Sequence, residues 1–241
     1  MTGGGAIDTV RVVPGPVCLV PEDAFTGRPP TLRVVAVVER SLGGGRWEAE
    51  EDVRVVTTAT GAIVLPSLAA PRRTASGGPH GVRRMRIRLL SPYLLDAEHP
   101  EGVEFDAPST TVPPVTRVRL YPLPAYPFPP GTRLLRGRVR RTWGTDVAGA
   151  ALTGRARTGD GYLPRVLPPW SEYAATAADG RFRLPLRRPG SKPRPAGQAA
   201  PEPEWFTVTA AAEPAHGGGP EATVHLTAAD ISGTEHLVEI P

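Results

Sequence analysis

A short motif that occurs twice constrains the fold of this 241-residue chain more than any other feature. Residues 61–66 read Gly-Ala-Ile-Val-Leu-Pro, and residues 180–185 read Gly-Arg-Phe-Arg-Leu-Pro. Both copies follow a stretch of threonine and small residues. A glycine turn followed by alternating apolar positions is typical of a hairpin that leads into a half-buried strand. The repeat therefore predicts two related β-domains in tandem.

The composition supports strands over coil. The chain holds 27 glycines and 30 prolines, a level near which disorder is suspected. However, 40% of the residues are hydrophobic, and they come in short runs bounded by glycine and proline. Runs at helical period are nearly absent, and short runs with turn residues between them are typical of β-sandwiches. The sequence therefore predicts an all-β chain of two tandem antiparallel β-sandwich domains joined by a proline-rich linker.

The expected organisation has four parts. We expect a flexible N-terminal arm over residues 1–15, a first sandwich over 16–120, a linker over 121–133 and a second sandwich over 134–241. Within the second domain, the low-complexity residues 187–204 predict a mobile loop.

The linker carries five prolines within residues 121–131, which favours an extended, stiff segment. We expect its aromatic residues Tyr121, Tyr126 and Phe128 to pack onto both domains and fix their angle. The alternative is a proline-rich ligand for an aromatic groove of another protein.

The net charge of +4 comes almost entirely from arginine. Such a charge could indicate a nucleic-acid surface, but no aromatic RNA-binding strand, phosphate loop or basic helix accompanies it. Residues 83–89 alternate arginine with apolar residues, which predicts an antiparallel strand with one solvent-facing side. Together with residues 136–141, these arginines could dock on an acidic protein partner through bidentate contacts with carboxylates. We therefore expect protein partners and no nucleic acid.

The sequence contains no clear catalytic or metal-binding motif. The five histidines lack the short spacings of zinc ligands, although His225 and His236 could lie on neighbouring strands. The acidic run over residues 48–52 lacks the alternation of a calcium loop, and no serine has the context of a nucleophile elbow. We therefore expect no enzymatic activity, no cofactor and no metal.

The single cysteine, Cys18, lies in an apolar run and is expected to be a small buried hydrophobic residue. No secretion signal and no membrane-spanning run is visible, so we expect a cytoplasmic protein without a membrane partner. We also expect the isolated chain to be a monomer.

The second block resembles a known family. Its strand start Leu-Arg-Gly-Arg-Val at 135–139, its Val-Ala-Gly-Ala turn at 147–150 and its Thr-Ala-Ala-Asp-Gly-Arg-Phe-Arg-Leu run at 176–184 resemble the carboxypeptidase regulatory-like domain. That family is a transthyretin-like (prealbumin-like) seven-stranded sandwich. The resemblance implies a spacer, binding platform or assembly module without catalytic residues, and the first block resembles the same fold more distantly.

Three functions are compatible with this reading. The first is a structural or assembly protein, because the chain is also similar to accessory modules of the cap or baseplate of phage-tail-like contractile injection particles. The second is a carbohydrate- or surface-binding module, and the third, ranked last, is an enzyme, for instance a peptidase accessory subunit with a hidden site. The binding platform for the second would be formed by four aromatic residues of the second block: Trp143, Tyr162, Trp170 and Tyr173. Alternatively, Trp143 caps the core and Trp170 anchors its proline-rich loop.

Overall fold

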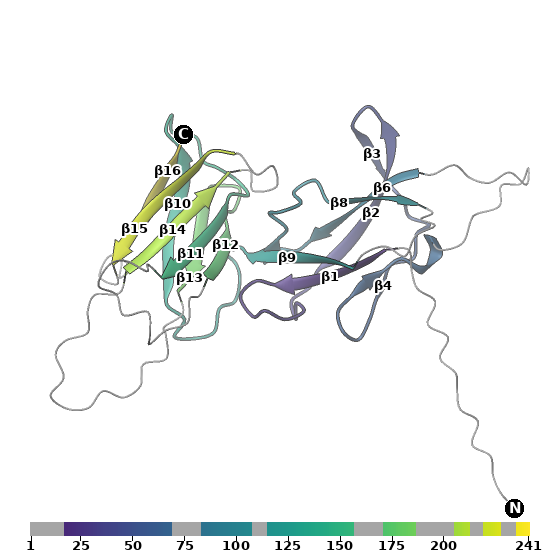
Figure 1. Cartoon of the computed structure of the whole chain (residues 1–241), viewed down its shortest axis with the longest axis horizontal. Helices are drawn as coiled ribbons and strands as arrows, with labels where there is room; N and C mark the ends of the chain where they lie inside the picture. The colour runs from purple at the N-terminus through teal and green to yellow at the C-terminus, as the bar shows by residue number, and fades with distance from the viewer. Residues whose placement is uncertain are drawn as a thin grey trace, which may run out of the picture. The chain divides into compact units, whose positions relative to one another are not determined.

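The computed structural model is all-β, as the sequence predicts (Figure 1). It describes residues 17–68, 83–107, 115–156, 171–186, 205–212, 219–227 and 235–241. Within these ranges the only helical element is the 3-10 turn η1 (Pro66–Leu68). The strands are β1 (Cys18–Asp23), β2 (Val35–Gly43), β3 (Arg46–Ala49), β4 (Val56–Thr57), β5 (Ile63–Val64), β6 (Arg83–Leu90), β7 (Leu94–Leu95), β8 (Val103–Ala107), β9 (Thr116–Pro122), β10 (Leu134–Arg141), β11 (Ala151–Ala156), β12 (Ser171–Ala175), β13 (Arg181–Pro185), β14 (Trp205–Ala211), β15 (Glu221–Thr227) and β16 (His236–Ile240).

The described strands form four sheets. Their orders are β4-β5-β1-β9-β7, β3-β2-β6-β8, β13-β10-β16 and β12-β11-β14-β15. By contact density the chain divides into two compact units. The first comprises Met1–Val20, Val38–Arg86 and Glu104–Thr116; the second comprises Pro21–Val37, Ile87–Val103 and Arg117–Pro241. The proline-rich residues 121–133 therefore belong to the second unit, and the domain boundaries expected from the sequence stay a prediction.

The two copies of the repeat fold into the same local turn. In the first copy the amide of Thr58 donates to the carbonyl of Ala62, and the amide of Gly61 donates to the carbonyl of Thr58. In the second, Ala177 and Gly180 make the equivalent bonds to Arg181 and Ala177. Both glycines have a positive φ, 81° and 72°, a conformation that a side chain disfavours. The turn predicted from the repeat is confirmed at both places.

A seven-stranded sandwich makes up most of the second compact unit. The sheet β13-β10-β16 and the sheet β12-β11-β14-β15 contribute to one hydrophobic core. Alternation along each strand directs the apolar side chains inward, as at Leu135 and Val139 of β10, both of which are completely buried. The largest core side chains in this cluster are Phe182, Phe206, Leu135, Leu152, Leu184 and Leu186.

One pairing in this sandwich departs from the antiparallel prediction. Strand β16 pairs with β10 in parallel, with Val139 opposite Val238. Parallel neighbours need a long connection, and almost the whole sandwich lies between these two strands in the sequence. The other sheet pairings of the sandwich are antiparallel.

Thr176 joins the end of β12 to the turn before β11. Its side chain is 1% exposed, and its hydroxyl donates to the carbonyl of Val147 at 2.6 Å. The same hydroxyl oxygen accepts the amide of Ala150 at 2.8 Å. One side chain therefore satisfies two buried backbone groups that a chain reversal would otherwise leave unpaired.

Replacing this hydroxyl with a methyl group should cost stability without changing the fold. We expect Thr176→Val to lower the free energy of unfolding by about 2 kcal/mol, because two buried backbone groups lose their partner. Thr176→Ser keeps the hydroxyl, and its free energy of unfolding should fall much less. Urea unfolding of the two variants measures this difference, and equal losses would show that packing alone matters at this position.

Strand β6 corrects one prediction made from alternation. Met85, Ile87 and Leu89 are buried, as expected. However, the side expected to face solvent includes Arg86, which is only 8% exposed. Its guanidinium forms an ion pair with Glu39 and lies 4.4 Å from the centre of the Trp47 ring. A cross-strand carboxylate and an aromatic face thus replace solvent at this position, and alternation alone cannot reveal either partner.

Candidate functional site

Five arginines lie on the outer face of the sheet β13-β10-β16. Since Leu135, Gly137 and Val139 of β10 point into the core, the residues between them point outward. Strand β13 has the same alternation around the buried Phe182 and Leu184. We call this surface the arginine face; it consists of Arg136, Arg138 and Arg140 of β10 and Arg181 and Arg183 of β13.

Three of these arginines have acidic partners from neighbouring turns. Asp146 accepts a hydrogen bond from Arg140 at 2.8 Å and another from Arg138 at 3.2 Å. The bond from Arg140, with the charge of both arginines, lowers the pKa of the Asp146 carboxyl, so this carboxylate stays charged in mildly acidic solution. Arg181 lies 3.5 Å from Asp179, in a pair that is largely exposed and contributes little.

The remaining two arginines face one another across the sheet. Arg136 and Arg183 occupy opposite positions in the antiparallel register of β10 and β13. Arg183 donates to the carbonyl of Pro124 at 2.9 Å, and its guanidinium lies 5.3 Å from the centre of the Phe128 ring. Burial, and secondarily the charge of Arg136, lower the pKa of Arg183. Like charges directly opposite each other destabilise a sheet, and within the described residues no carboxylate lies within ion-pair distance of either arginine.

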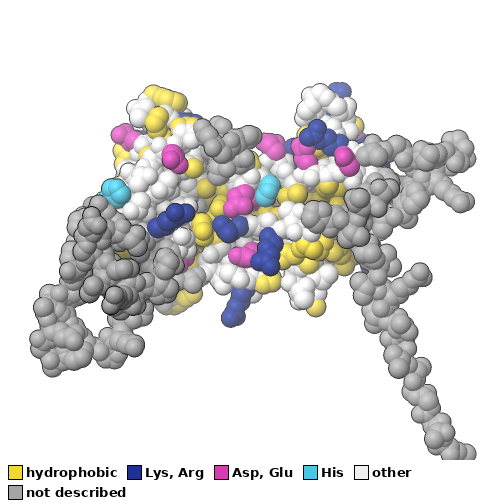
Figure 2. Space-filling view, in the orientation of Figure 1, with side chains coloured by type: hydrophobic (Ala, Val, Ile, Leu, Met, Phe, Trp, Pro, Cys, Tyr) yellow, Lys and Arg dark blue, Asp and Glu magenta, His cyan; other side chains and the backbone are white. Residues whose placement is uncertain are grey.

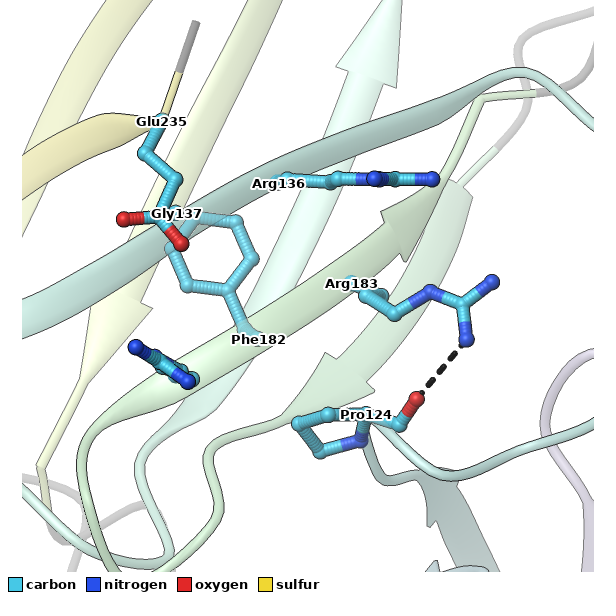
Figure 3. A pocket seen from close by; sticks show the side chains of 7 residues that line it. Pro124, Arg136, Gly137, Phe182, Arg183 and Glu235 are labelled. Carbon is cyan, nitrogen blue, oxygen red and sulfur yellow. Dashed lines mark hydrogen bonds between the residues drawn. The ribbon is translucent and has the colours of Figure 1, made fainter.

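A pocket of about 310 Å³ opens at this pair (Figure 3). In Figure 3 the side chains of Arg136 and Arg183 extend the same way, and Glu235 lies over Gly137 and Phe182. The described lining residues are Pro124, Arg136, Gly137, Arg181, Phe182, Arg183 and Glu235. The pocket therefore combines arginine side chains, a carboxylate and an apolar floor.

The opposite face of the same sandwich has a different chemistry. Pairing of β11, β12, β14 and β15 aligns Tyr173, Thr153, Thr209 and Thr223 in one row across the sheet. The hydroxyls of Thr209 and Thr223 lie 3.2 Å apart. Arg155 is the arginine described on this face, where it is exposed. One face of the sandwich is thus rich in arginine and the other in hydroxyl groups.

Positive and negative side chains are mixed on the face that Figure 2 shows. On the face seen in Figure 2, the Lys and Arg side chains of the described residues are interspersed with Asp and Glu. A large field of one sign, which non-specific nucleic-acid binding requires, is not visible on this face among the described side chains.

The aromatic residues of the proline-rich segment belong to a cluster with the loop after β1. The ring of Tyr126 packs edge to face on Phe25, with ring centres 5.7 Å apart, and lies 4.7 Å from Phe128. Its hydroxyl donates to Asp23, which is 1% exposed, at 2.7 Å. Burial and this bond to Asp23 raise the pKa of Tyr126. All four residues lie in the second compact unit, so the inter-domain packing role stays a prediction.

Tyr121 makes a second set of contacts within that unit. Its ring centre lies 5.4 Å from that of Tyr173, and its hydroxyl donates to Glu98 at 2.7 Å. Burial raises the pKa of Tyr121, and the bond to Glu98 adds to this rise. The guanidinium of Arg119 lies 4.7 Å from the centre of the Tyr173 ring. Tyr173 therefore contacts both an aromatic ring and a cation.

The expected aromatic platform is described only in part. Trp143 lies in the turn after β10, is 68% exposed and has Arg141 at 5.4 Å from its ring centre. Tyr173 lies on β12, in the other sheet. Tyr162 and Trp170 lie outside the described residues, as does the loop 187–204, so the platform stays a prediction.

Histidines and acidic side chains do not converge on a metal site within the part of the chain that the structure describes. His99 contacts Asp96, with its Nδ1 3.1 Å from a carboxylate oxygen. His225 lies 3.3 Å from the Thr207 hydroxyl on the outer face of its sheet. His80 and His216 lie outside the described residues.

Asp96 provides a test of pH dependence. Burial raises the pKa of its carboxyl, an effect that contacts with His99 reduce without reversing. The folded state therefore binds a proton more readily than the unfolded state, so the charged form costs stability above the folded pKa. That cost disappears as the pH falls below the unfolded value. We expect Asp96→Asn, whose amide oxygen can still accept the His99 amide, to raise Tm relative to the native chain at pH 7 and to lose this advantage in acid. Calorimetry from pH 3 to 7 measures it, and a constant Tm difference would contradict the assignment.

No helix long and apolar enough to cross a bilayer occurs among the described residues.

Comparisons with known proteins add little. No protein family matches the chain, and no curated protein does. The solved structure of a candidate adhesin from Bacteroides ovatus matches at 12% identity and a TM-score of 0.25, covering 100% of this chain and 95% of that chain. A similarity of this size carries no argument about fold or function.

Sequence reasoning found the arginines of 136–141 but missed their grouping with β13. The alternation of Arg181 and Arg183 around Phe182 was a usable signal, since it marks the same kind of half-exposed strand. The register that places Arg136 opposite Arg183 depends on a long-range pairing that no local pattern specifies.

Proposed function

We propose that this chain is a non-enzymatic assembly protein that docks through its arginine face on an acidic surface of another protein. The observation that carries the proposal is the opposition of Arg136 and Arg183 without a described carboxylate partner. An acidic side chain from a partner would supply the missing counter-charge. Arginine suits this role because its planar fork binds a carboxylate through two parallel hydrogen bonds.

A rigid scaffold supports the proposal. The arginines stand on strands whose inward side chains are fully buried, so their backbone positions are fixed before a partner arrives. Preorganised side chains lose less conformational entropy on binding than side chains of a loop. A module of this kind needs no catalytic group.

The particular assembly we propose is a phage-tail-like contractile injection particle in the bacterial cytoplasm, with the chain as a cap or baseplate accessory. Support for this finer assignment comes from the all-β architecture and from the sequence resemblance of the second block to carboxypeptidase regulatory-like modules. Because one fold serves many functions, its test has to come from the native source.

A second candidate is a carbohydrate- or surface-binding module. The row of hydroxyl groups of Thr153, Thr209 and Thr223 on the opposite sheet favours it, since polar side chains in a binding site fix the orientation of a ligand such as a sugar. The two proposals thus use opposite faces of one sandwich.

The docking proposal is tested by whether the chain forms a protein complex that depends on the arginine face and on ionic strength. We expect the tagged chain, expressed in its source cell, to elute in a larger protein complex at low ionic strength and to leave it as salt rises, because exposed charge pairs are screened. Arg136→Glu should abolish this co-elution, whereas Arg155→Glu on the opposite face should not. If the chain elutes alone yet is retained by an immobilised polysaccharide, the second candidate is correct.

A further inference from the structure

The pocket beside the arginine pair is lined by one carboxylate and three guanidinium groups, since Arg181 also belongs to the lining. Arg136 and Arg183 extend the same way, while Glu235 lies over Gly137 and Phe182 (Figure 3). No ion pair of Glu235 or Arg136 occurs among the described residues. The pocket can therefore receive a ligand that brings a negative and a positive group at once.

We propose that this pocket binds a short extended segment of a partner protein, with an Asp or Glu carboxylate between Arg136 and Arg183 and a basic side chain near Glu235. This inference rests on the proposed function and specifies the sequence that the docking surface recognises. Each guanidinium can donate two parallel hydrogen bonds to a carboxylate oxygen pair. The carboxylate would also relieve the repulsion between two arginines held at opposed positions of the sheet.

The size and charge of the pocket argue against other anions. A volume of about 310 Å³ is at the low end for small-molecule sites, which suits a side chain and its adjoining backbone. Glu235 would repel any anion in the pocket, and a partner segment can offset this repulsion with a basic side chain, which inorganic phosphate lacks. A polyanion would in addition meet Asp146, which already occupies Arg138 and Arg140.

Arg183 has a second role as a positioning contact. Its bond to the Pro124 carbonyl and its stacking on Phe128 fix the guanidinium beside the pocket. Substituting Arg183 would therefore disturb the proline-rich segment as well as the pocket. Arg136 has no such structural contact among the described residues, so Arg136→Gln is the cleaner variant.

The test uses the purified full chain and two capped peptides, acetyl-Gly-Glu-Gly-Lys-Gly-amide and the same peptide with Gln in place of Glu. Binding is followed by NMR titration. We expect the Glu peptide to shift signals of β10 and β13 and the Gln peptide to bind at least about tenfold more weakly. Arg136→Gln should weaken binding of the Glu peptide by a similar factor, while Arg155→Gln should leave this binding unchanged. The Tm of each variant establishes that it is folded.

Two further arms test the ligand class. Glu235→Gln should weaken binding of the Glu peptide, whose Lys would lie near Glu235. The same variant should not change binding of a third peptide in which Gly replaces this Lys. Inorganic phosphate at equal concentration should not displace the peptide. Displacement by phosphate, or equal binding of the Glu peptide to Arg136→Gln and the native chain, would overturn the inference.

The result separates the inference from the proposed function. If the peptides fail to bind but co-elution still depends on Arg136, the docking role stands and the recognised sequence is wrong. If the peptides bind but no salt-sensitive complex exists in the source cell, the pocket stands and the assembly role is wrong.

Discussion

The variant Gly137→Ala should unfold far more easily than the native chain. An added Cβ at Gly137 would lie 2.3 Å from the carbonyl oxygen of His236 and 2.6 Å from the Phe182 ring. Neither neighbour can give way, because one is backbone of the paired strand β16 and the other a core ring that is 1% exposed. Overpacking of this kind costs about 3 kcal/mol or more. A loss of this size corresponds to a fall in Tm of about 6–12 °C for a chain of this length.

A second glycine of the same sandwich provides the matched control. Gly154 also lies within a strand, but its added Cβ would meet side-chain carbons and not backbone, with the methyl groups of Leu184 at 3.0 Å and Leu186 at 3.3 Å. We expect Gly154→Ala to lose about 1 kcal/mol or less, since these methyl groups can move. Calorimetry of both variants gives the comparison. Equal Tm values for the two would show that Gly137 does not accommodate the Phe182 ring in the way described.

A large loss of stability is also expected for Tyr126→Ala. This change removes a ring that is 5% exposed and that contacts Phe25 and Phe128. Truncation of a buried aromatic residue costs about 3–5 kcal/mol. It also leaves Asp23, which is 1% exposed, without the hydroxyl that donates to it.

Two further variants divide this loss between ring and hydroxyl. Tyr126→Phe keeps the ring and removes only the bond to Asp23, which should cost about 1–3 kcal/mol. Trp143→Ala is the control, because its side chain is 68% exposed and such substitutions change stability by about 0.5 kcal/mol or less. Urea unfolding ranks the three variants. A Tyr126→Ala protein as stable as Trp143→Ala would mean that the proline-rich segment is not packed.

The prediction of the fold rested on two local sequence patterns, alternation along strands and a repeated glycine turn. Alternation predicted a strand over residues 83–89 with Met85, Ile87 and Leu89 on one side, and the structure has β6 there. The repeated glycine turn was identified because positive φ values leave a strong residue preference at Gly61 and Gly180. These features depend on residues that are close in the sequence, and local sequence patterns therefore predict them.

Long-range pairing accounts for what the sequence could not show. The parallel contact of β10 with β16 joins segments about a hundred residues apart, and no local signal specifies it. The burial of Arg86 depends on Glu39, 47 residues away. The pocket depends in the same way on the register of β10 with β13 and on Pro124. The candidate site was therefore predictable as arginine-rich strands and not as a site.

Site-specific photocrosslinking in the source cell tests whether the chain docks through its arginine face. A photoreactive amino acid is placed either at Arg181, exposed on the arginine face, or at Arg155, exposed on the opposite face of the same sandwich. We expect a crosslink from position 181 to an acidic segment of one protein. This crosslink should be lost when Arg136→Glu is added, and position 155 should give no such crosslink. Crosslinks from position 155 alone, or from neither position, would contradict docking through the arginine face.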